Sequence, residues 1–283
     1  MKNIFEQLDH STIRFLDHSL KKTIFNEPYN ALASFAIDDA IATTVGNKLS
    51  PPTVRMWVHD QTVVLGIPDS RLPFIEEGVK YLHALGYHVI IRNSGGLAVL
   101  IDKGVLNMSF ILPSKNHLSI HDGYDIMYTF IQELFREYTS DIKAYEIKGS
   151  YCPGDYDLSI NGIKFAGISQ RRVRNGVAIQ IYLDVEGDSK VRASTIKNFY
   201  ELSKQNITTK HIYPDVNPKV MGTISELLQE KFTVKELIAK IKNLITKTKT
   251  KSAPNLLYEE EIFQKRLAQM HKRNEKLFFI NKV

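Results

Sequence analysis

Cysteine is almost missing from this chain of 283 residues, in which Cys152 is the single example. One cysteine cannot form an internal disulfide, and it cannot supply the cysteine pairs of a structural zinc site. One pair of the nine histidines, His117 and His121, has the H-x-x-x-H spacing, but it lacks the glutamate of the H-E-x-x-H zinc motif, and the sequence predicts no metal site. Internal repeats and low-complexity tracts are absent as well.

Long apolar runs are also missing. No window approaches ~18 consecutive apolar residues, so neither a membrane span nor a membrane partner is predicted. Residues 1–6 are soon interrupted by charge and do not resemble an export signal. A single cysteine is typical of reducing compartments, and these features together predict a cytoplasmic protein.

The positive charge is concentrated at one end of the chain. Residues 231–283 contain 13 Lys and Arg against 5 Asp and Glu, whereas the rest contains 24 against 26. This basic end either contacts an acidic partner or is the solvated surface of a helix. A nucleic-acid-binding protein is an alternative function, but few aromatics accompany the basic residues and no RNP-like pattern occurs, so we predict no nucleic-acid partner.

Apolar periodicity and turn residues alternate between helix and strand along the first half of the chain. The pattern predicts helices over 29–46, 73–85 and 122–138, and strands over 89–91, 97–101 and 105–112. Segments 54–58 and 62–66 are predicted to form a hairpin. The segment that contains His10 and His18 is predicted to be helix or loop, with a structural role for both histidines.

The second half contains the clearest β signal. Segments 156–160 and 163–173 flank Asn161-Gly162, the strongest short hairpin signal, and a further strand is expected over 177–185. Capping boxes at 223–226 and 233–236 predict helix starts. Segment 247–254 reads as a linker to a final basic helix. We therefore expect an α+β fold with a largely antiparallel sheet, a catalytic domain over 1–250 and a basic helical extension over 251–283.

Cys152 lies in the segment Gly149-Ser150-Tyr151-Cys152-Pro153-Gly154-Asp155. Glycine and proline on both sides predict an irregular loop directly before a strand. Loops of this kind often carry chemistry, whereas free cysteines are often buried as small apolar residues. The local sequence therefore leaves two interpretations, a buried residue or a reactive thiol.

Two further positions have the same ambiguity. Asn93-Ser94-Gly95-Gly96 follows a predicted strand but lacks the spacing of a Walker or dinucleotide loop, so it is either a tight turn or a close approach to a ligand. The two-residue turn places Lys164 opposite Ser159, on a face shared with Ala166, Ile168 and Gln170. Lys164 then either extends to solvent at a sheet edge or places its ammonium in a site.

These positions together resemble a known family. Ile91-Arg92-Asn93-Ser94-Gly95-Gly96-Leu97-Ala98-Val99 is similar to the R-R-x-S-G-G-G-x-V segment of lipoate and biotin protein ligases, and 161–170 is similar to their N-G-K-K strand. The resemblance covers about residues 30–250. It implies the catalytic fold of that family, and it implies contacts with substrate from Arg92, Ser94, Gly95, Gly96, Val99, Phe165, Ala166 and Gly167.

The chain departs from the ligases at two positions. Leu97 replaces the third glycine of the loop, and Ile101 replaces a histidine that precedes an aspartate. Both changes argue against the use of ATP, and we predict no cofactor. The cysteine before the lysine strand instead resembles the cysteine-dependent octanoyltransferases of the same family.

Within that branch, 150–162 is most similar to the amidotransferases. Those enzymes move octanoyl groups from the glycine-cleavage H protein, the donor, to the lipoyl domains of 2-oxoacid dehydrogenases. The resemblance implies that Cys152 carries an octanoyl thioester and that Lys164 activates the thiol and contacts the acyl carbonyl. Transfer from acyl carrier protein and ATP-dependent lipoate ligation remain alternatives.

This chemistry imposes geometric demands. Loop 150–155 must fold back over the sheet to bring the thiol to Lys164. Arg171 and Arg172 are weaker candidates than Lys164 for the cation that activates the thiol. Main-chain amides at Ser94 or Gly95-Gly96 could stabilise an oxyanion. A saturated chain needs an apolar tunnel, with candidate walls at Leu97, Val99, Phe165 and Ile168.

Overall fold

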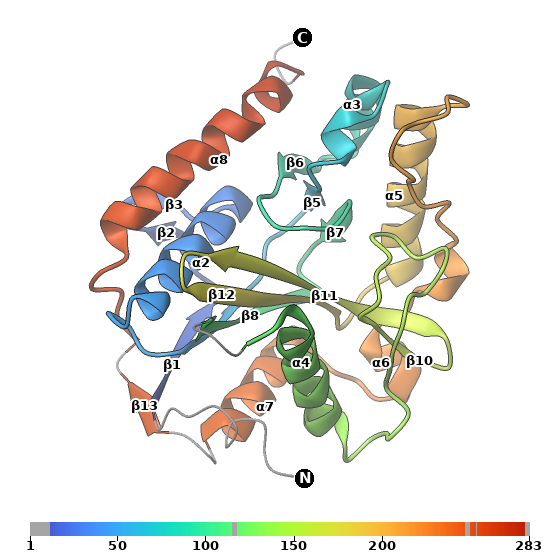
Figure 1. Cartoon of the computed structure of the whole chain (residues 1–283). Coiled ribbons are helices and arrows are strands. Elements are labelled where there is room, and N and C mark those ends of the chain that lie inside the picture. Colours follow the sequence, from blue (N-terminus) through green and yellow to red (C-terminus); the bar gives the residue numbers. More distant parts are fainter. Residues whose placement is uncertain (1–11, 115–117, 247–249, 253, 281–283) are drawn as a thin grey trace.

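An eight-stranded sheet runs through the centre of the computed structural model, which describes residues 12–114, 118–246, 250–252 and 254–280 (Figure 1). Its strand order is β13-β1-β4-β8-β12-β11-β10-β9. Neighbours from β4 to β9 are antiparallel, and β1 is parallel to both β4 and β13. The predicted α+β class with a largely antiparallel sheet is confirmed.

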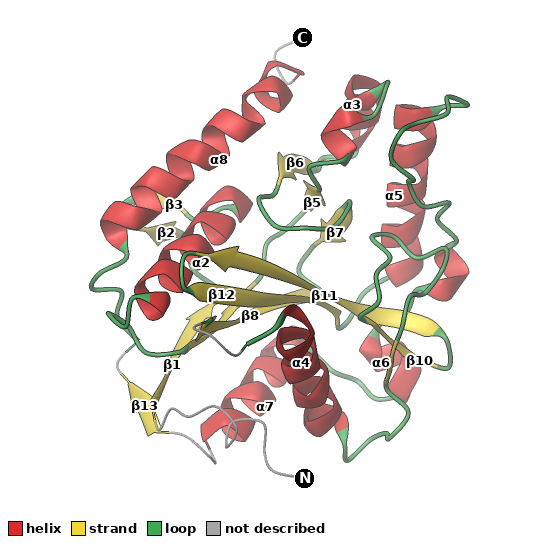
Figure 2. Ribbon diagram, in the orientation of Figure 1, coloured by secondary structure: helices red, strands yellow, loops and turns green. Residues whose placement is uncertain are grey.

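Groups of strands are separated by helices along the chain (Figure 2). None of the described helices has the length and apolar character needed to cross a bilayer. The elements are β1 Thr12–His18, β2 Thr23–Ile24, β3 Glu27–Pro28, α2 Ala31–Gly46, β4 Thr53–Trp57, β5 Thr62–Leu65, η1 Asp69–Arg71, α3 Ile75–Ala84, β6 His88–Ile91, β7 Val99–Ile101, β8 Val105–Pro113, α4 Ile120–Phe135, β9 Lys143–Ala144, β10 Asp157–Ile160, β11 Ile163–Val173, β12 Gly176–Asp184, α5 Ser189–Lys204, η2 Pro218–Val220, α6 Ile224–Leu228, α7 Val234–Thr246, β13 Thr250–Ser252 and α8 Glu260–Ile280.

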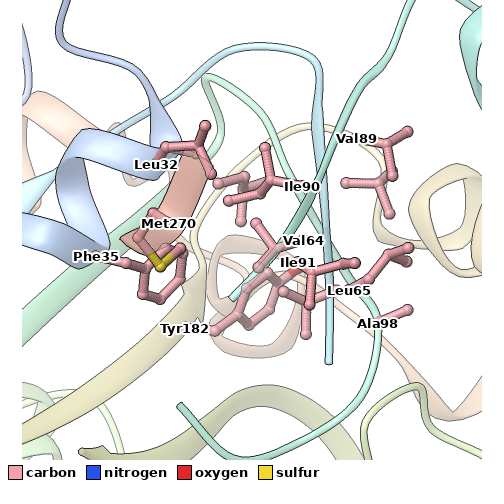
Figure 3. Close-up of a cluster of buried hydrophobic side chains, with 14 of the residues drawn as sticks. Leu32, Phe35, Val64, Leu65, Val89, Ile90, Ile91, Ala98, Tyr182 and Met270 are labelled. Carbon is pink, nitrogen blue, oxygen red and sulfur yellow. The ribbon is translucent and has the colours of Figure 1, made fainter. Parts of the chain in front are cut away.

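The sheet separates two cores. Helices α2, α3, α5 and α8 and a three-stranded sheet, β6-β5-β7, cover one face, and α4 and α7 pack against the other (Figure 1). Strand β12 is buried along its whole length, and its residues alternate between the cores. Tyr182 contributes to the first core, part of which Figure 3 shows, and Ile181 contributes to the second.

The predicted hairpin over 54–58 and 62–66 is wrong. Strand β4 pairs with β1 and β8 in the large sheet, whereas β5 pairs with β6 and β7 in the small one. Periodicity finds both strands but cannot assign their partners. Likewise β7 and β8, joined by the turn at 102–104, belong to different sheets.

Strand β13, near the C-terminal end of the described residues, pairs with the first strand, β1, at one edge of the large sheet. His18 ends strand β1, which corrects the prediction of helix or loop, while His10 lies outside the described residues. Residues 250–252 of the predicted linker form β13 and pair with β1; 247–249 and 253 are outside the described residues. Nearby, the buried Arg14 donates to Glu259 at 2.8 Å.

Helix α5 was not predicted, although its signals are present. Asp188 caps it, and Ala193, Ile196 and Phe199 follow at helical spacing. The final basic helix was predicted, and it packs into the fold as α8. Its apolar face joins the first core through Phe263, Leu267, Met270 and Leu277.

Asn274 of α8 forms a further link to the small sheet. Its buried side chain accepts from the amide of Ile91 at 2.6 Å and donates to the carbonyl of Ile91 at 3.1 Å. Strand β6 is the edge of that sheet, so Asn274 takes the place of a neighbouring strand.

We expect Asn274→Ala to destabilise the protein by about 2–4 kcal/mol, because two buried backbone groups lose their partner. Urea unfolding measures the effect, and Glu275→Ala is the control because Glu275 is exposed on the same helix. Equal unfolding midpoints for the two variants would contradict a stabilising role for Asn274.

Candidate active site

The loop that carries Cys152 is folded back over the large sheet. Lys164 in β11 donates from Nζ to the carbonyl of Tyr151 at 2.9 Å and to that of Cys152 at 3.0 Å. Cys152 itself has φ of 47°, a left-handed conformation that side chains other than glycine adopt rarely. The loop therefore occupies the position that the predicted chemistry requires, and Lys164 holds it there.

Lys164 is buried and also pairs with Asp157, at 2.7 Å between Nζ and Oδ1. Asp157 accepts from the amide of Ile147 at 3.1 Å, so it anchors a second point of the same loop. Burial raises the pKa of Asp157, and Lys164 opposes that rise. The ammonium is thus bonded to a carboxylate and to loop carbonyls, and these contacts hold the backbone around Cys152.

The thiol of Cys152 is contacted by other groups. Its Sγ accepts from the amide of Leu97 at 3.1 Å and from Nη2 of Arg92 at 3.4 Å. The same Nη2 donates to the carbonyl of Leu97 at 2.7 Å. Arg92 is therefore the cation in contact with the sulfur. Arg171 instead pairs with Asp39, and Arg172 donates to carbonyls that precede α4.

Gly96 allows this close approach. A Cβ at position 96 would lie 2.2 Å from Nη2 of Arg92 and 2.9 Å from Sγ of Cys152, and its φ is 102°. Any side chain would therefore collide with both groups. Gly95 has no such neighbour, and the buried Ser94 lies outside the cavity described below.

A hydrogen-bonded chain holds the backbone after Gly96. The amide of Ala98 donates to the hydroxyl of Tyr200 at 3.1 Å, and that hydroxyl donates to Asp69 at 2.9 Å. Asp69 also accepts from the amide of Gly66 at 2.7 Å. Burial raises the pKa of Asp69 to about 6. The amide that faces Cys152 thus belongs to a segment fixed from the opposite side by two buried side chains.

A cavity of about 450 Å³ extends from Cys152 over the sheet. This volume is in the usual range for small-molecule sites. Gly167, Tyr182, Asn107 and Trp57 occupy one register row of β11, β12, β8 and β4 and line its floor. The lining also includes Phe35, Val64, Val99, Ile101, Arg92, Gly95, Gly96, Lys164 and Ile168.

Phe165 and Ala166 do not line this cavity. Both are buried in the second core, on the other face of the sheet. The pairing of β10 with β11 shifts between Leu158 and Ser159, so that Phe165 is an extra residue in the ladder. This bulge changes the alternation, and Gly167 instead of Ala166 is next to Lys164. Leu97 contributes its backbone to the site and its side chain to the first core.

A thiol beside a backbone amide, above a largely apolar cavity, is the arrangement that acyl transfer through a cysteine requires. Comparison with known proteins gives the family. Residues 30–246 match the lipoyl protein ligase A/B catalytic domain. The chain belongs to this family.

Relatives with established names cover nearly the whole chain. An octanoyl-[GcvH]:protein N-octanoyltransferase of Oceanobacillus iheyensis is 53% identical over 97% of this chain and 99% of its own length. A lipoyl-[GcvH]:protein N-lipoyltransferase of Listeria monocytogenes is 47% identical over 81% of this chain and 82% of its own. Among solved structures, lipoate-protein ligase A bound with ATP has a TM-score of 0.66 at 16% identity, covering 92% and 95% of the two chains.

The contacts of the sulfur generate a prediction. We expect Arg92→Gln to slow alkylation of Cys152 by iodoacetamide about tenfold near neutral pH, because loss of the adjacent cation disfavours the thiolate. Arg171→Gln is the matched control, since Arg171 pairs with Asp39 and does not contact the sulfur. A larger effect in the control would assign the activation to a different cation.

The chain from Ala98 to Asp69 generates a second prediction. Tyr200→Phe should lower kcat for acyl transfer about tenfold with little change in KM, because the backbone at 97–98 loses its support. Tyr213→Phe is the control: it removes a neighbouring hydroxyl that bonds Pro68 instead of Ala98. Equal losses of activity in both variants would mean that Tyr200 only stabilises the fold.

Proposed function

We propose that the protein is an octanoyl amidotransferase. It takes an octanoyl group from a lysine of the glycine-cleavage H protein and attaches it to a lysine of the lipoyl domains of 2-oxoacid dehydrogenases. The single observation that carries this proposal is a partly buried thiol at one end of a cavity, between a guanidinium and a backbone amide. The names of the relatives support a donor in which the acyl group is attached to a protein.

The transfer has two balanced steps. In the first, Sγ of Cys152 attacks the carbonyl carbon of the donor amide, the C–S bond forms and the C–N bond breaks. The thiol proton ends on the amine of the released donor lysine. In the second, the amine of the acceptor lysine attacks the carbonyl carbon of the thioester, the C–N bond forms, the C–S bond breaks, and the amine proton passes to the released sulfur. One lysine amide replaces another, so no ATP and no cofactor are needed.

The surroundings of Cys152 suit these steps. The amide of Leu97 and the guanidinium of Arg92 lie next to the sulfur. When the sulfur attacks, negative charge develops on the adjoining oxygen of the tetrahedral intermediate, and hydrogen-bond donors at this position stabilise it. Lys164 donates to two carbonyls of the loop and so fixes the backbone that carries the thiol. Gly96, Val99 and Gly167 leave the adjoining space open to the acyl chain.

We expect the exchange to be reversible. Purified protein should move octanoyl from H protein to a lipoyl domain without ATP, and it should approach similar amounts of both acylated proteins from either direction. Intact-mass measurement should detect an octanoyl adduct on the enzyme that hydroxylamine removes. Cys152→Ala should lose the adduct and at least about 10³-fold of the rate, because the covalent route depends on the thiolate.

Three outcomes would favour other functions. Transfer from acyl carrier protein alone, with no reaction of octanoyl-H protein, would indicate an octanoyltransferase that uses a carrier thioester. Pyrophosphate release would indicate a lipoate ligase. Salt-dependent retention on DNA without an acyl adduct would indicate a nucleic-acid-binding protein.

A further inference from the structure

The floor of the cavity leads away from the thiol. Gly167 lies beside Lys164, and Trp57 lies three strands away in the same register row. At the usual strand spacing this separation is about 14 Å. A chain attached to Cys152 that follows the floor therefore passes Tyr182 and ends near Asn107 and Trp57.

This far end is more polar than a tunnel for a saturated chain requires. Trp57, Asn107 and Gln180 line it, and each is more than nine-tenths buried. Nε1 of Trp57, Nδ2 of Asn107 and Oε1 of Gln180 have no hydrogen-bond partner among the residues that the structure describes. Two donors and one acceptor without partners thus belong to residues that line the same cavity.

The orientation of two of these groups is fixed. Nε2 of Gln180 donates to Asp38 at 2.7 Å, so the amide oxygen must point away from that carboxylate. Asp38 is in turn paired with the buried Arg55 at 2.7 Å. The ring of Trp57 packs edge-on against Phe35, with 5.6 Å between centroids. The side chains of Gln180 and Trp57 therefore cannot easily turn to find other partners.

Buried polar groups without partners are costly, and they are normally bonded to water or to a ligand. A buried water needs two to four polar partners. The methyl end of a saturated chain can displace such water only by leaving the polar groups unpaired.

We propose that Trp57, Asn107 and Gln180 form a polar terminal subsite that holds water behind an eight-carbon acyl chain and rejects longer saturated chains. A longer chain is accepted only if its tip carries a hydroxyl or another hydrogen-bonding group that replaces the water. This inference rests on the proposed function of Cys152 as the acyl carrier, and it deepens that function by assigning chain-length selection to named residues.

The experiment measures formation of the acyl-enzyme by intact mass. The probes are octanoyl, decanoyl and 10-hydroxydecanoyl thioesters of N-acetylcysteamine, so no protein partner is needed. For the wild type we expect decanoyl to react at least about tenfold more slowly than octanoyl, and 10-hydroxydecanoyl to recover most of that loss. Asn107→Leu, which keeps the side-chain size, should raise the decanoyl rate relative to octanoyl about tenfold and remove the advantage of the hydroxyl.

Ser203→Ala is the matched control. Its hydroxyl is equally buried and unpartnered among the described residues but lies outside the cavity, so the chain-length profile should not change. Trp57→Phe, which removes only the indole N–H and some ring area, tests the subsite if Asn107→Leu does not fold.

Two failures are distinguishable. If no probe acylates Cys152, the proposed function fails. If octanoyl acylates Cys152 but both substitutions leave the octanoyl-to-decanoyl ratio unchanged, the terminal subsite is wrong and the proposed function stands.

Discussion

The rest of the site depends on the ion pair and the hydrogen bonds that the ammonium of Lys164 forms. It is buried, it is paired with Asp157, and it donates to two consecutive carbonyls of the loop that carries Cys152. Removing one partner of a buried ion pair typically costs about 3–5 kcal/mol, because the other charge is left uncompensated. The loop therefore has little freedom to leave the sheet, although its own sequence of glycine and proline is not that of a rigid element. The ammonium of Lys164, a residue of strand β11, thus holds the left-handed backbone at Cys152 in place.

Two separate layers thus converge on one sulfur. Strand β11 supplies the cation that fixes the thiol loop. The connection between β6 and β7 of the small sheet supplies the amide of Leu97 and the guanidinium of Arg92, which contact the sulfur. The first core between these layers also contains the cavity. The distance between the thiol of Cys152 and the amide of Leu97 therefore depends on the side chains that pack the two sheets together.

The sequence predicted the motifs well and their surroundings less well. The Asn161-Gly162 turn correctly places Lys164 opposite Ser159, since a two-residue turn fixes the register. The bulge at Phe165 could not be predicted, because it depends on pairing with β10. Of the three contacts predicted at Phe165, Ala166 and Gly167, only that at Gly167 lines the cavity. The roles of Asp69 and Tyr200 were also not predictable, since they lie 131 positions apart and meet only in the folded chain. Local patterns give elements and turns, whereas partners across the fold require the tertiary structure.

The pairing of β1 with β13 and the contact of Arg14 with Glu259 have a consequence for the order of folding. The first described strand finds its outer neighbour only after some 240 further residues have been synthesised, as the separation of Arg14 and Glu259 is 245 positions. Contacts of such long range make folding slow, and they cannot form while the last helix is still inside the ribosome. During synthesis one edge of the large sheet is therefore open, and the arrival of the C-terminal segment closes it.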